Sequence, residues 1–192
     1  HSFEISKRRV LMVEDRLLLW RLKNGNEDAL CRIYEKHRTR LLKLANALSN
    51  DRDLAEDVVQ DVFVSFAQST KRLRVGGNLR AYLATSVANR VRNRFRDDRG
   101  RPHVSLDSAD AIASTSRTPQ QWATYSEDMR KVNDALEQIS YEQREVVLLH
   151  VHGGMKFRAI SQLQNVSINT VQSRYRYAVE KLRIVLKGQR PE

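Results

Sequence analysis

The densest run of acidic side chains lies between residues 50 and 61, in a chain that is otherwise basic. It consists of Asp51, Asp53, Glu56, Asp57 and Asp61. On a helix, Asp57 and Asp61 share one face, where carboxylates can hold a hard metal ion, remain solvated or dock onto a basic protein surface. The sequence places no histidine or lysine base beside them, which makes a metal-dependent nuclease the least favoured interpretation. We expect this face to dock onto a protein.

A second group of chemically useful side chains follows Ser167, a residue that can cap a long final helix. Four apolar residues recur there at steps of four, three and four and predict one buried stripe: Val171, Tyr175, Ala178 and Leu182. The stripe leaves Asn169, Gln172, Ser173, Arg176 and Tyr177 on the outside. Amide and guanidinium groups near a helix N-terminus can read base edges in the major groove of DNA. The alternative is an ordinary amphipathic helix with a solvated polar face.

The remaining candidate ligands and nucleophiles do not indicate a catalytic centre. His150 and His152 are two residues apart, do not share a helix face and lack a third ligand, so we interpret them as structural. Cys31 has no identifiable base and is expected to be inert. As the one cysteine of the chain, it excludes an internal disulfide and fits a reducing cytoplasm. We expect neither a cofactor nor a bound metal ion.

The overall charge indicates a polyanionic partner. The 192 residues include 34 Lys and Arg against 23 Asp and Glu, which gives a formal net charge of +11. Nucleic acid is the favoured partner, followed by an anionic membrane surface. Ten basic residues lie within 71–101 and eight within 155–192, an arrangement that favours contact with backbone phosphates. The apolar runs are too short for a signal-peptide core or a membrane span, so we expect a soluble cytoplasmic protein without membrane insertion.

The elements that must hold these side chains are helices, because Gly and Pro are few and no segment alternates as a half-buried strand does. Three helices are expected first, over residues 27–48, 53–66 and 79–96. Asn26 can cap the first, and Asp53 with Glu56 resembles a capping box for the second. Together they predict a first domain over residues 17–99, preceded by an N-terminal extension over residues 1–16.

Between residues 100 and 125 the periodicity is lost among Pro, Ser, Thr, Asp and Ala, a composition typical of a flexible linker. The helices expected beyond it run up to residue 150, over residues 157–164, and onward from Ser167. Ser140 and Gln143 form a capping-box pair, and Asn165 tolerates the left-handed backbone of a tight turn. Two helices joined by three residues suggest a helix-turn-helix. The expected fold is all-α, with two small helical domains, the second over residues 126–188.

Three sequence blocks in a fixed order carry a family resemblance. They are Asp53-Leu-Ala-Glu-Asp-Val-Val-Gln-Asp-Val-Phe63, Leu79-Arg-Ala-Tyr-Leu-Ala-Thr-Ser-Val-Ala-Asn89, and Arg144-Glu-Val-Val-Leu-Leu149 with Asn169-Thr-Val-Gln-Ser-Arg174. Over roughly residues 17–186 the chain resembles the extracytoplasmic-function (ECF) sigma factors of bacterial RNA polymerase. The resemblance implies a non-enzymatic subunit that binds core polymerase and directs promoter-specific initiation of transcription. The alternative is a stand-alone helix-turn-helix regulator, which would not need the acidic surface.

The resemblance also implies roles for individual residues. Those expected to dock on the clamp helices of the largest polymerase subunit are Asp57, Gln60, Asp61 and Phe63. Those expected to capture the minus-ten promoter element, in the domain called region 2, are Asn78, Arg80, Tyr82, Asn89, Arg90, Asn93, Arg94 and Arg96. Those expected to contact the minus-thirty-five element, in region 4, are Asn169, Thr170, Gln172, Ser173, Arg174, Arg176 and Tyr177. The family makes an anti-sigma protein a plausible further partner.

Within region 4, we expect Gln172, Ser173 and Arg176 to face bases, whereas Asn169, Thr170 and Arg174 lie nearer phosphates. Three positions depart from the family pattern. Tyr82 stands where Trp is usual, Asn93 stands where Asp is common, and residues 159–161 read Ala-Ile-Ser where Glu-Ile-Ala is usual. We expect none of these departures to change the fold.

Overall fold

The computed structural model describes residues 2–70, 78–100 and 127–186, and every regular element within these ranges is a helix. In chain order the helices are α1 (Ser2–Lys23), α2 (Asp28–Ser49), α3 (Arg52–Ser69), α4 (Leu79–Gly100), α6 (Glu127–Glu137), α7 (Tyr141–Val151), α8 (Phe157–Gln164) and α9 (Ile168–Leu186). The predicted all-α fold is therefore confirmed for the described residues.

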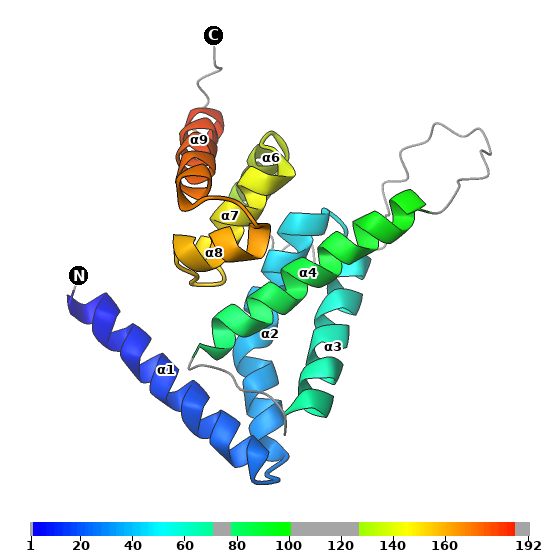
Figure 1. Ribbon diagram of the computed structural model, residues 1–192, viewed down its shortest axis with the longest axis vertical. Coiled ribbons are helices and arrows are strands. Elements are labelled where there is room, and N and C mark those ends of the chain that lie inside the picture. The colour runs from blue at the N-terminus through cyan, green and yellow to red at the C-terminus, as the bar shows by residue number, and fades with distance from the viewer. Residues whose placement is uncertain (1, 71–77, 101–126, 187–192) are drawn as a thin grey trace.

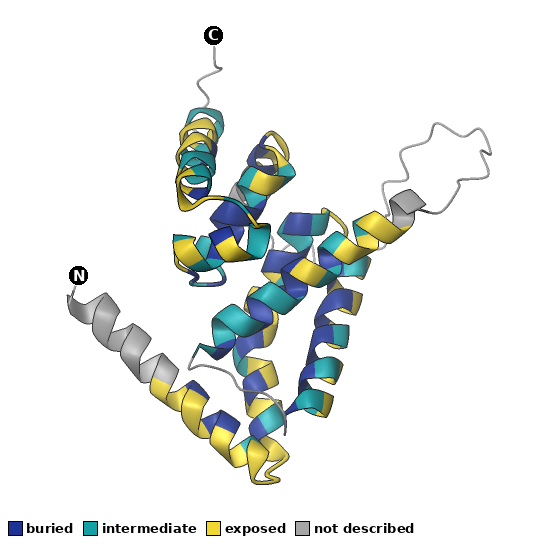
Figure 2. Ribbon diagram, viewed as in Figure 1, coloured by how far each residue is buried: buried dark blue, intermediate teal, exposed yellow. Residues whose placement is uncertain are grey.

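Helices α1 to α4 build the first domain. α2 and α3 pack against each other, and α4 crosses both of them (Figure 1). The apolar stripes predicted from the sequence meet at this crossing, where the fully buried side chains include Ile33, Leu44, Val58, Phe66 and Val87. Figure 2 shows the buried residues turned toward the interior of this group, whereas the last turns of α4 extend beyond it and are exposed.

The predicted start of the second helix is wrong by two residues. Asp51, and not Asp53, is the N-cap of α3, because its side chain accepts a hydrogen bond from the Leu54 amide at 3.0 Å. At the start of α2, the Asn26 side chain makes the predicted capping hydrogen bond, because it accepts from the Ala29 amide at 3.0 Å. The regular helix begins at Asp28, two residues after Asn26. Both Asp51 and Asp53 are good capping residues, so the sequence offered two starting points for α3.

The predicted N-terminal extension belongs to a helix, because α1 runs from Ser2 to Lys23 and the expected boundary at residue 17 falls inside it. The buried Asp15 fixes α1 to α2. Its carboxylate accepts a hydrogen bond from Lys36 Nζ at 2.7 Å and lies 3.2 Å from His37 Nε2. Burial on its own would raise the pKa of the Asp15 carboxyl, but the hydrogen bonds from His37 and Lys36 outweigh it and lower that pKa.

Helices α6 to α9 build the second domain, and its local signals match the prediction closely. Ser140 and Gln143 form the expected capping box at the start of α7. Asn165 ends α8 with a left-handed φ of 53°. Ser167 Oγ accepts from the Thr170 amide at 3.1 Å and so caps α9. α8 and α9, joined by this short turn, form the predicted helix-turn-helix.

The two domains touch each other through α7, which packs against α2 and α4. Buried residues of both domains join in one hydrophobic cluster, with Val87 and Val91 on one side and Val146 and Leu149 on the other. Most of the predicted linker, residues 101–125, lies outside the described residues, as does most of the predicted break at 71–78. In the part of the chain that is described, no helix is long and apolar enough to cross a membrane.

Candidate nucleic-acid and protein interfaces

The acidic surface expected to dock on a protein lies on α3. Asp57 and Gln60 are exposed, and Asp61 is 45% exposed on the side that faces α4. There, Asp61 forms ion pairs with two arginines of α4, Arg90 at 3.2 Å and Arg94 at 3.6 Å. The Asp61 carboxylate is therefore paired within the chain and remains partly accessible to solvent. Asp57 lies one turn before Asp61 and Gln60 one residue before it, and both are exposed to solvent.

Phe63 is not part of the exposed surface. Its side chain is only 7% exposed, and its ring makes an edge contact with Tyr34 at a centroid distance of 4.8 Å. The Phe63 ring therefore packs α3 against α2 in this structure, and its assignment to the docking surface stays a prediction. The cause is the helix phase, because Phe63 follows Val62 and lies at the edge of the buried stripe of α3.

Four of the eight residues expected to contact the minus-ten element are partly buried and make contacts within the chain. Asn78 caps α4, since its side chain accepts from the Ala81 amide at 3.0 Å. Tyr82 is half-buried and packs toward the ring of Phe66. Arg90 donates to the Asp61 carboxylate, the Asp61 carbonyl and the Ser65 hydroxyl. These three side chains therefore have partners within the first domain, and their roles toward DNA stay predictions.

Arg80 is the fourth, and its partners lie in the second domain. Its Nε donates to the His152 carbonyl at 2.7 Å and its Nη2 donates to the Val151 carbonyl at 2.6 Å. In this arrangement the guanidinium of Arg80 is therefore occupied by the backbone just after α7. Sequence spacing offered no signal for this contact, because its partners are 71 and 72 residues away.

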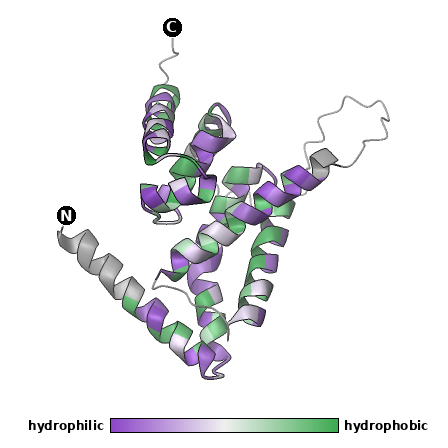
Figure 3. Cartoon of the chain, in the orientation of Figure 1, coloured by the Kyte–Doolittle hydropathy of each residue, from purple (hydrophilic) through white to green (hydrophobic). Residues whose placement is uncertain are grey.

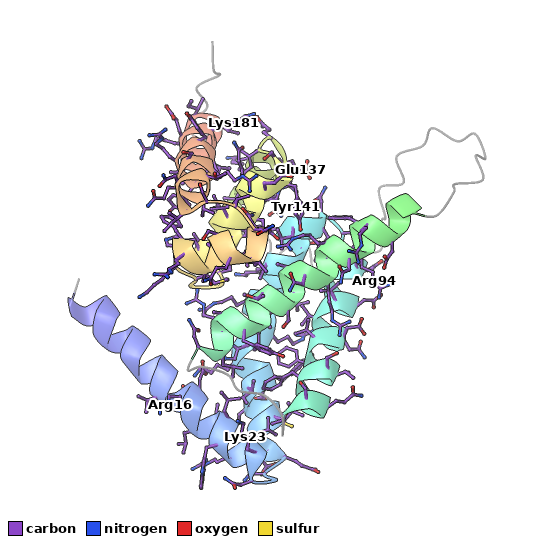
Figure 4. The ribbon with its side chains drawn as sticks, in the orientation of Figure 1. Arg16, Lys23, Arg94, Glu137, Tyr141 and Lys181 are labelled. Carbon is purple, nitrogen blue, oxygen red and sulfur yellow. The ribbon has the colours of Figure 1, made fainter. Side chains whose placement is uncertain are left out.

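The other four residues lie on the projecting half of α4. Asn89, Asn93, Arg94 and Arg96 are all exposed. Figure 4 labels Arg94 on this part of α4, and Figure 3 shows hydrophilic residues along the same end of the helix. Two of the four also have partners within the chain, because Arg94 pairs with Asp61 of α3 at 3.6 Å and Asn89 accepts from Arg92 Nη1 at 3.2 Å. Amides and guanidinium groups spaced along one exposed helix can hydrogen-bond to splayed bases and pair with phosphates. These four are the exposed members of the predicted minus-ten set.

Helix α9 presents most of the expected minus-thirty-five residues to solvent. Asn169, Gln172, Arg176 and Tyr177 are exposed, and Val171 and Ala178 are fully buried on the opposite side. The guanidinium of Arg176 lies over the Tyr177 ring, 5.1 Å from its centroid. Arg176 Nη2 also donates a hydrogen bond to the Tyr177 hydroxyl at 3.5 Å, so Tyr177 orients the arginine through its ring and through its hydroxyl.

The remaining three residues of α9 are half-buried. Thr170 Oγ1 shares a hydrogen bond with the capping Ser167 Oγ at 2.9 Å. Arg174 donates from Nη1 to Gln164 Oε1 at 2.7 Å, so it ties α9 to α8. Ser173 lies between the exposed and buried faces. The structure thus brings the seven predicted residues onto one helix and separates the exposed set from those that hold the helix-turn-helix together.

Sequence reasoning missed the pair formed by Arg92 and Glu145. Arg92 Nε and Nη2 donate to Glu145 Oε1 at 2.9 and 2.7 Å, and Glu145 is 2% exposed. Glu145 stands inside the apolar run of α7, where a carboxylate requires a partner once buried. That anomaly is the signal that could have pointed to an arginine elsewhere in the chain. Among the described residues, no group of three or more His, Cys, Asp or Glu side chains could hold a metal ion.

Comparison with known proteins agrees with this architecture. The sequence profile of Sigma-70 region 2 matches residues 33–101, and that of Sigma-70 region 4 matches residues 129–182. The RNA polymerase sigma factor CarQ of Myxococcus xanthus is 30% identical over 171 residues, which cover 86% of this chain and 94% of CarQ. The ECF RNA polymerase sigma factor SigL of Mycobacterium tuberculosis is 30% identical over 163 residues, covering 84% of this chain and 91% of SigL.

A solved structure shows the same fold. It is the sigma factor RpoE from Bartonella quintana in complex with the anti-sigma factor NepR, with 25% identity and a TM-score of 0.59, covering 83% of this chain and 97% of that chain. Two sigma regions in order, matched along nearly the whole length of curated relatives, do not favour a stand-alone regulator. This chain belongs to the ECF family of RNA polymerase sigma factors.

Proposed function

We propose that residues 17–99 and 126–188 act as region 2 and region 4 of this sigma factor, and that region 2 docks on the clamp helices of the largest polymerase subunit through the acidic face of α3. The observation that carries the proposal is the exposure of Asp57, Gln60 and one side of Asp61, in a chain with a formal net charge of +11. Opposite charge on a clamp surface would steer and orient this contact.

The DNA contacts are assigned to two separate helices. Asn89, Asn93, Arg94 and Arg96 on the projecting half of α4 serve the minus-ten element, where melted bases and backbone phosphates need amide and cationic partners. On α9, Gln172 and Arg176 face the bases of the minus-thirty-five element, and Asn169 lies near the helix N-terminus, where phosphates bind. Tyr177 supports Arg176 through their ring contact.

The chain itself supplies recognition and strand separation, whereas RNA synthesis is catalysed by the polymerase, so we propose no enzymatic activity for the chain. Its place of action is the cytoplasm, with the transcription machinery. The RpoE structure holds an anti-sigma factor, and we propose a regulator of the same class for this chain. Such a partner would compete with polymerase for region 2 or region 4.

The test is co-purification of the full chain with purified core polymerase. We expect a stoichiometric complex that is weakened by Asp57→Arg and unchanged by Asp28→Arg, an equal charge reversal at an exposed position of α2. Circular dichroism verifies that both variants keep their helices. The docking proposal is refuted if Asp57→Arg and Asp28→Arg bind core polymerase as tightly as the unaltered chain.

A further inference from the structure

Helix α1 exposes apolar side chains on the side that is turned away from the first domain. Val13, Leu17 and Trp20 are 66%, 46% and 64% exposed, and they follow one another at steps of four and three residues. At about 100° per residue, these three side chains lie within about 60° of one another on the helix surface. We call them the α1 stripe. A contiguous exposed apolar surface of this kind marks a contact with a partner or a membrane.

The opposite side of α1 determines that the stripe points outward. Leu18 and Leu19 are buried in the hydrophobic cluster, and Asp15 is 5% exposed and bonded to Lys36 and His37 of α2. A rotation of α1 that covered the stripe would expose both leucines and separate the Asp15 carboxylate from its partners. Figure 1 shows α1 at the edge of the first domain, with its N-terminal half leading away from the other helices. The stripe is therefore open to a large surface.

Cationic side chains border the stripe. Arg16 and Arg21 are exposed, and the helical period places them about 40° beyond the stripe on its two sides. Figure 4 labels Arg16 on this part of α1. The two acidic residues closest to the stripe, Glu14 and Asp15, are instead bonded to Lys36 of α2, each at 2.7 Å. The outer side of α1 thus combines apolar side chains with an excess of positive charge.

A second copy of the chain is a poor occupant for the α1 stripe. Complete burial of its exposed parts would cover about 300–400 Å² per chain, whereas a standard protein interface needs about 800 Å² per partner. Two copies would also bring the arginines that border each stripe close together, and like charges repel.

An anionic lipid surface matches both the apolar and the charged part of this side of α1. Tryptophan prefers the boundary between headgroups and acyl chains, and a helix that lies in this boundary carries Leu and Trp on one face with Lys and Arg beside them. The sequence of α1 before the stripe adds Lys-Arg-Arg at residues 7–9. A bilayer also needs no groove to receive a single helix, because its surface adapts to the side chains.

We propose that α1 binds the surface of an anionic lipid bilayer, with the α1 stripe at the boundary between headgroups and acyl chains and with Arg16 and Arg21 bound to lipid phosphates. The contact is peripheral, since no helix in the described part of the chain is long and apolar enough to span the bilayer. It involves none of the residues assigned to polymerase on α3 or to DNA on α4 and α9. Variants of the stripe therefore leave those surfaces in place.

The test is binding of the full chain to vesicles made of equal parts phosphatidylglycerol and phosphatidylcholine, beside vesicles of phosphatidylcholine alone. We expect co-sedimentation with the anionic vesicles and little with the neutral ones. Trp122→Phe leaves Trp20 as the one tryptophan, and its emission should shift to shorter wavelength because the ring leaves water. Leu17→Gln should weaken binding to anionic vesicles about ten-fold through loss of apolar burial. Val151→Gln, at an apolar position of α7 that is 55% exposed, is the matched control.

A second pair of variants separates α1 from the net charge of the chain. Arg16→Glu with Arg21→Glu should weaken vesicle binding more than Arg158→Glu with Arg183→Glu, an equal charge change at exposed positions of α8 and α9. Circular dichroism verifies that all variants keep their helices.

The membrane contact is refuted if the unaltered chain does not bind anionic vesicles, if Leu17→Gln and Val151→Gln bind them equally, or if both double reversals weaken binding to the same extent. Two other occupants would give their own patterns, and either pattern overturns the proposal. Without vesicle binding, dimers of the chain that Leu17→Gln dissociates would assign the stripe to a second copy. Loss of core polymerase affinity in Leu17→Gln, again without vesicle binding, would assign it to the polymerase.

Discussion

Reversal of the charge at Asp61 tests whether the acidic face of α3 serves docking or only the internal ion pairs. Asp61→Arg removes the pairs with Arg90 and Arg94 and places a third guanidinium beside them. All three side chains are more than one-third exposed, so solvent screening limits the cost to region 2 to about 1–3 kcal/mol. Arg90 also keeps its bonds to the Asp61 carbonyl and the Ser65 hydroxyl. A domain stability of about 5–15 kcal/mol tolerates this loss, so the variant should remain folded.

The effect on polymerase binding should be larger than the effect on folding. Removing one partner of an interfacial charge pair costs about 2–5 kcal/mol, which lowers affinity roughly 30-fold or more. The assay is a titration of fluorescently labelled chain with core polymerase, beside thermal unfolding followed by circular dichroism. Asp28→Arg is the matched control, since it makes the same charge change at an exposed position of α2, away from the acidic face of α3. Equal core affinities of Asp61→Arg, Asp28→Arg and the unaltered chain would refute the docking role of Asp61.

Three further outcomes follow from the structure. Val62→Asp should unfold region 2, because it buries a carboxylate without a partner at a position that is 2% exposed; a fully helical, thermally stable variant would contradict this packing. Arg176→Ala should weaken promoters that carry a matching upstream element by about 1–3 kcal/mol more than promoters without it, and equal loss across a promoter library would contradict base recognition. Lowering the pH from 7.5 to about 5.5 should weaken the packing of α7 on α2 and α4, because burial and the charges of Arg40, Arg80 and Lys43 lower the pKa of His152 from its ordinary 6.5. The neutral imidazole stabilises this packing above pH 6.5, and the stability is lost as the pH falls. Thermal unfolding followed by circular dichroism should show this dependence, and His152→Gln should remove it.

Local signals in the sequence predicted most of the second domain. The capping box of Ser140 and Gln143, the left-handed turn at Asn165 and the bounds of α8 all depend on residues within a few positions of one another. Their geometry is therefore decided by nearby backbone hydrogen bonds and allowed dihedral angles, which sequence patterns report directly. The buried stripe of α9 was predicted for the same reason, since Val171 and Ala178 repeat with the helical period.

The interfaces could be predicted only in part. The exposed residues of α3 and α9 follow from helix phase, but the partners of Arg80, Arg90 and Arg92 lie 25 to 72 residues away. No local pattern states which carboxylate or carbonyl an arginine will meet, so residues that hold the fold and residues that face DNA look alike in the sequence. The same limit concealed the pair of Arg92 and Glu145.

The most direct test of the central claim is transcription in vitro with purified core polymerase over a promoter library, with and without the full chain. We predict that the chain makes core polymerase initiate at a limited subset of promoters that share a minus-ten and a minus-thirty-five element. We also predict that exposed residues of α4 and α9, such as Arg94 and Arg176, determine activity at that subset. If the folded chain binds core polymerase but initiation shows no dependence on promoter sequence, or if no transcript forms beyond that of core alone, the assignment of promoter recognition to these two helices is wrong.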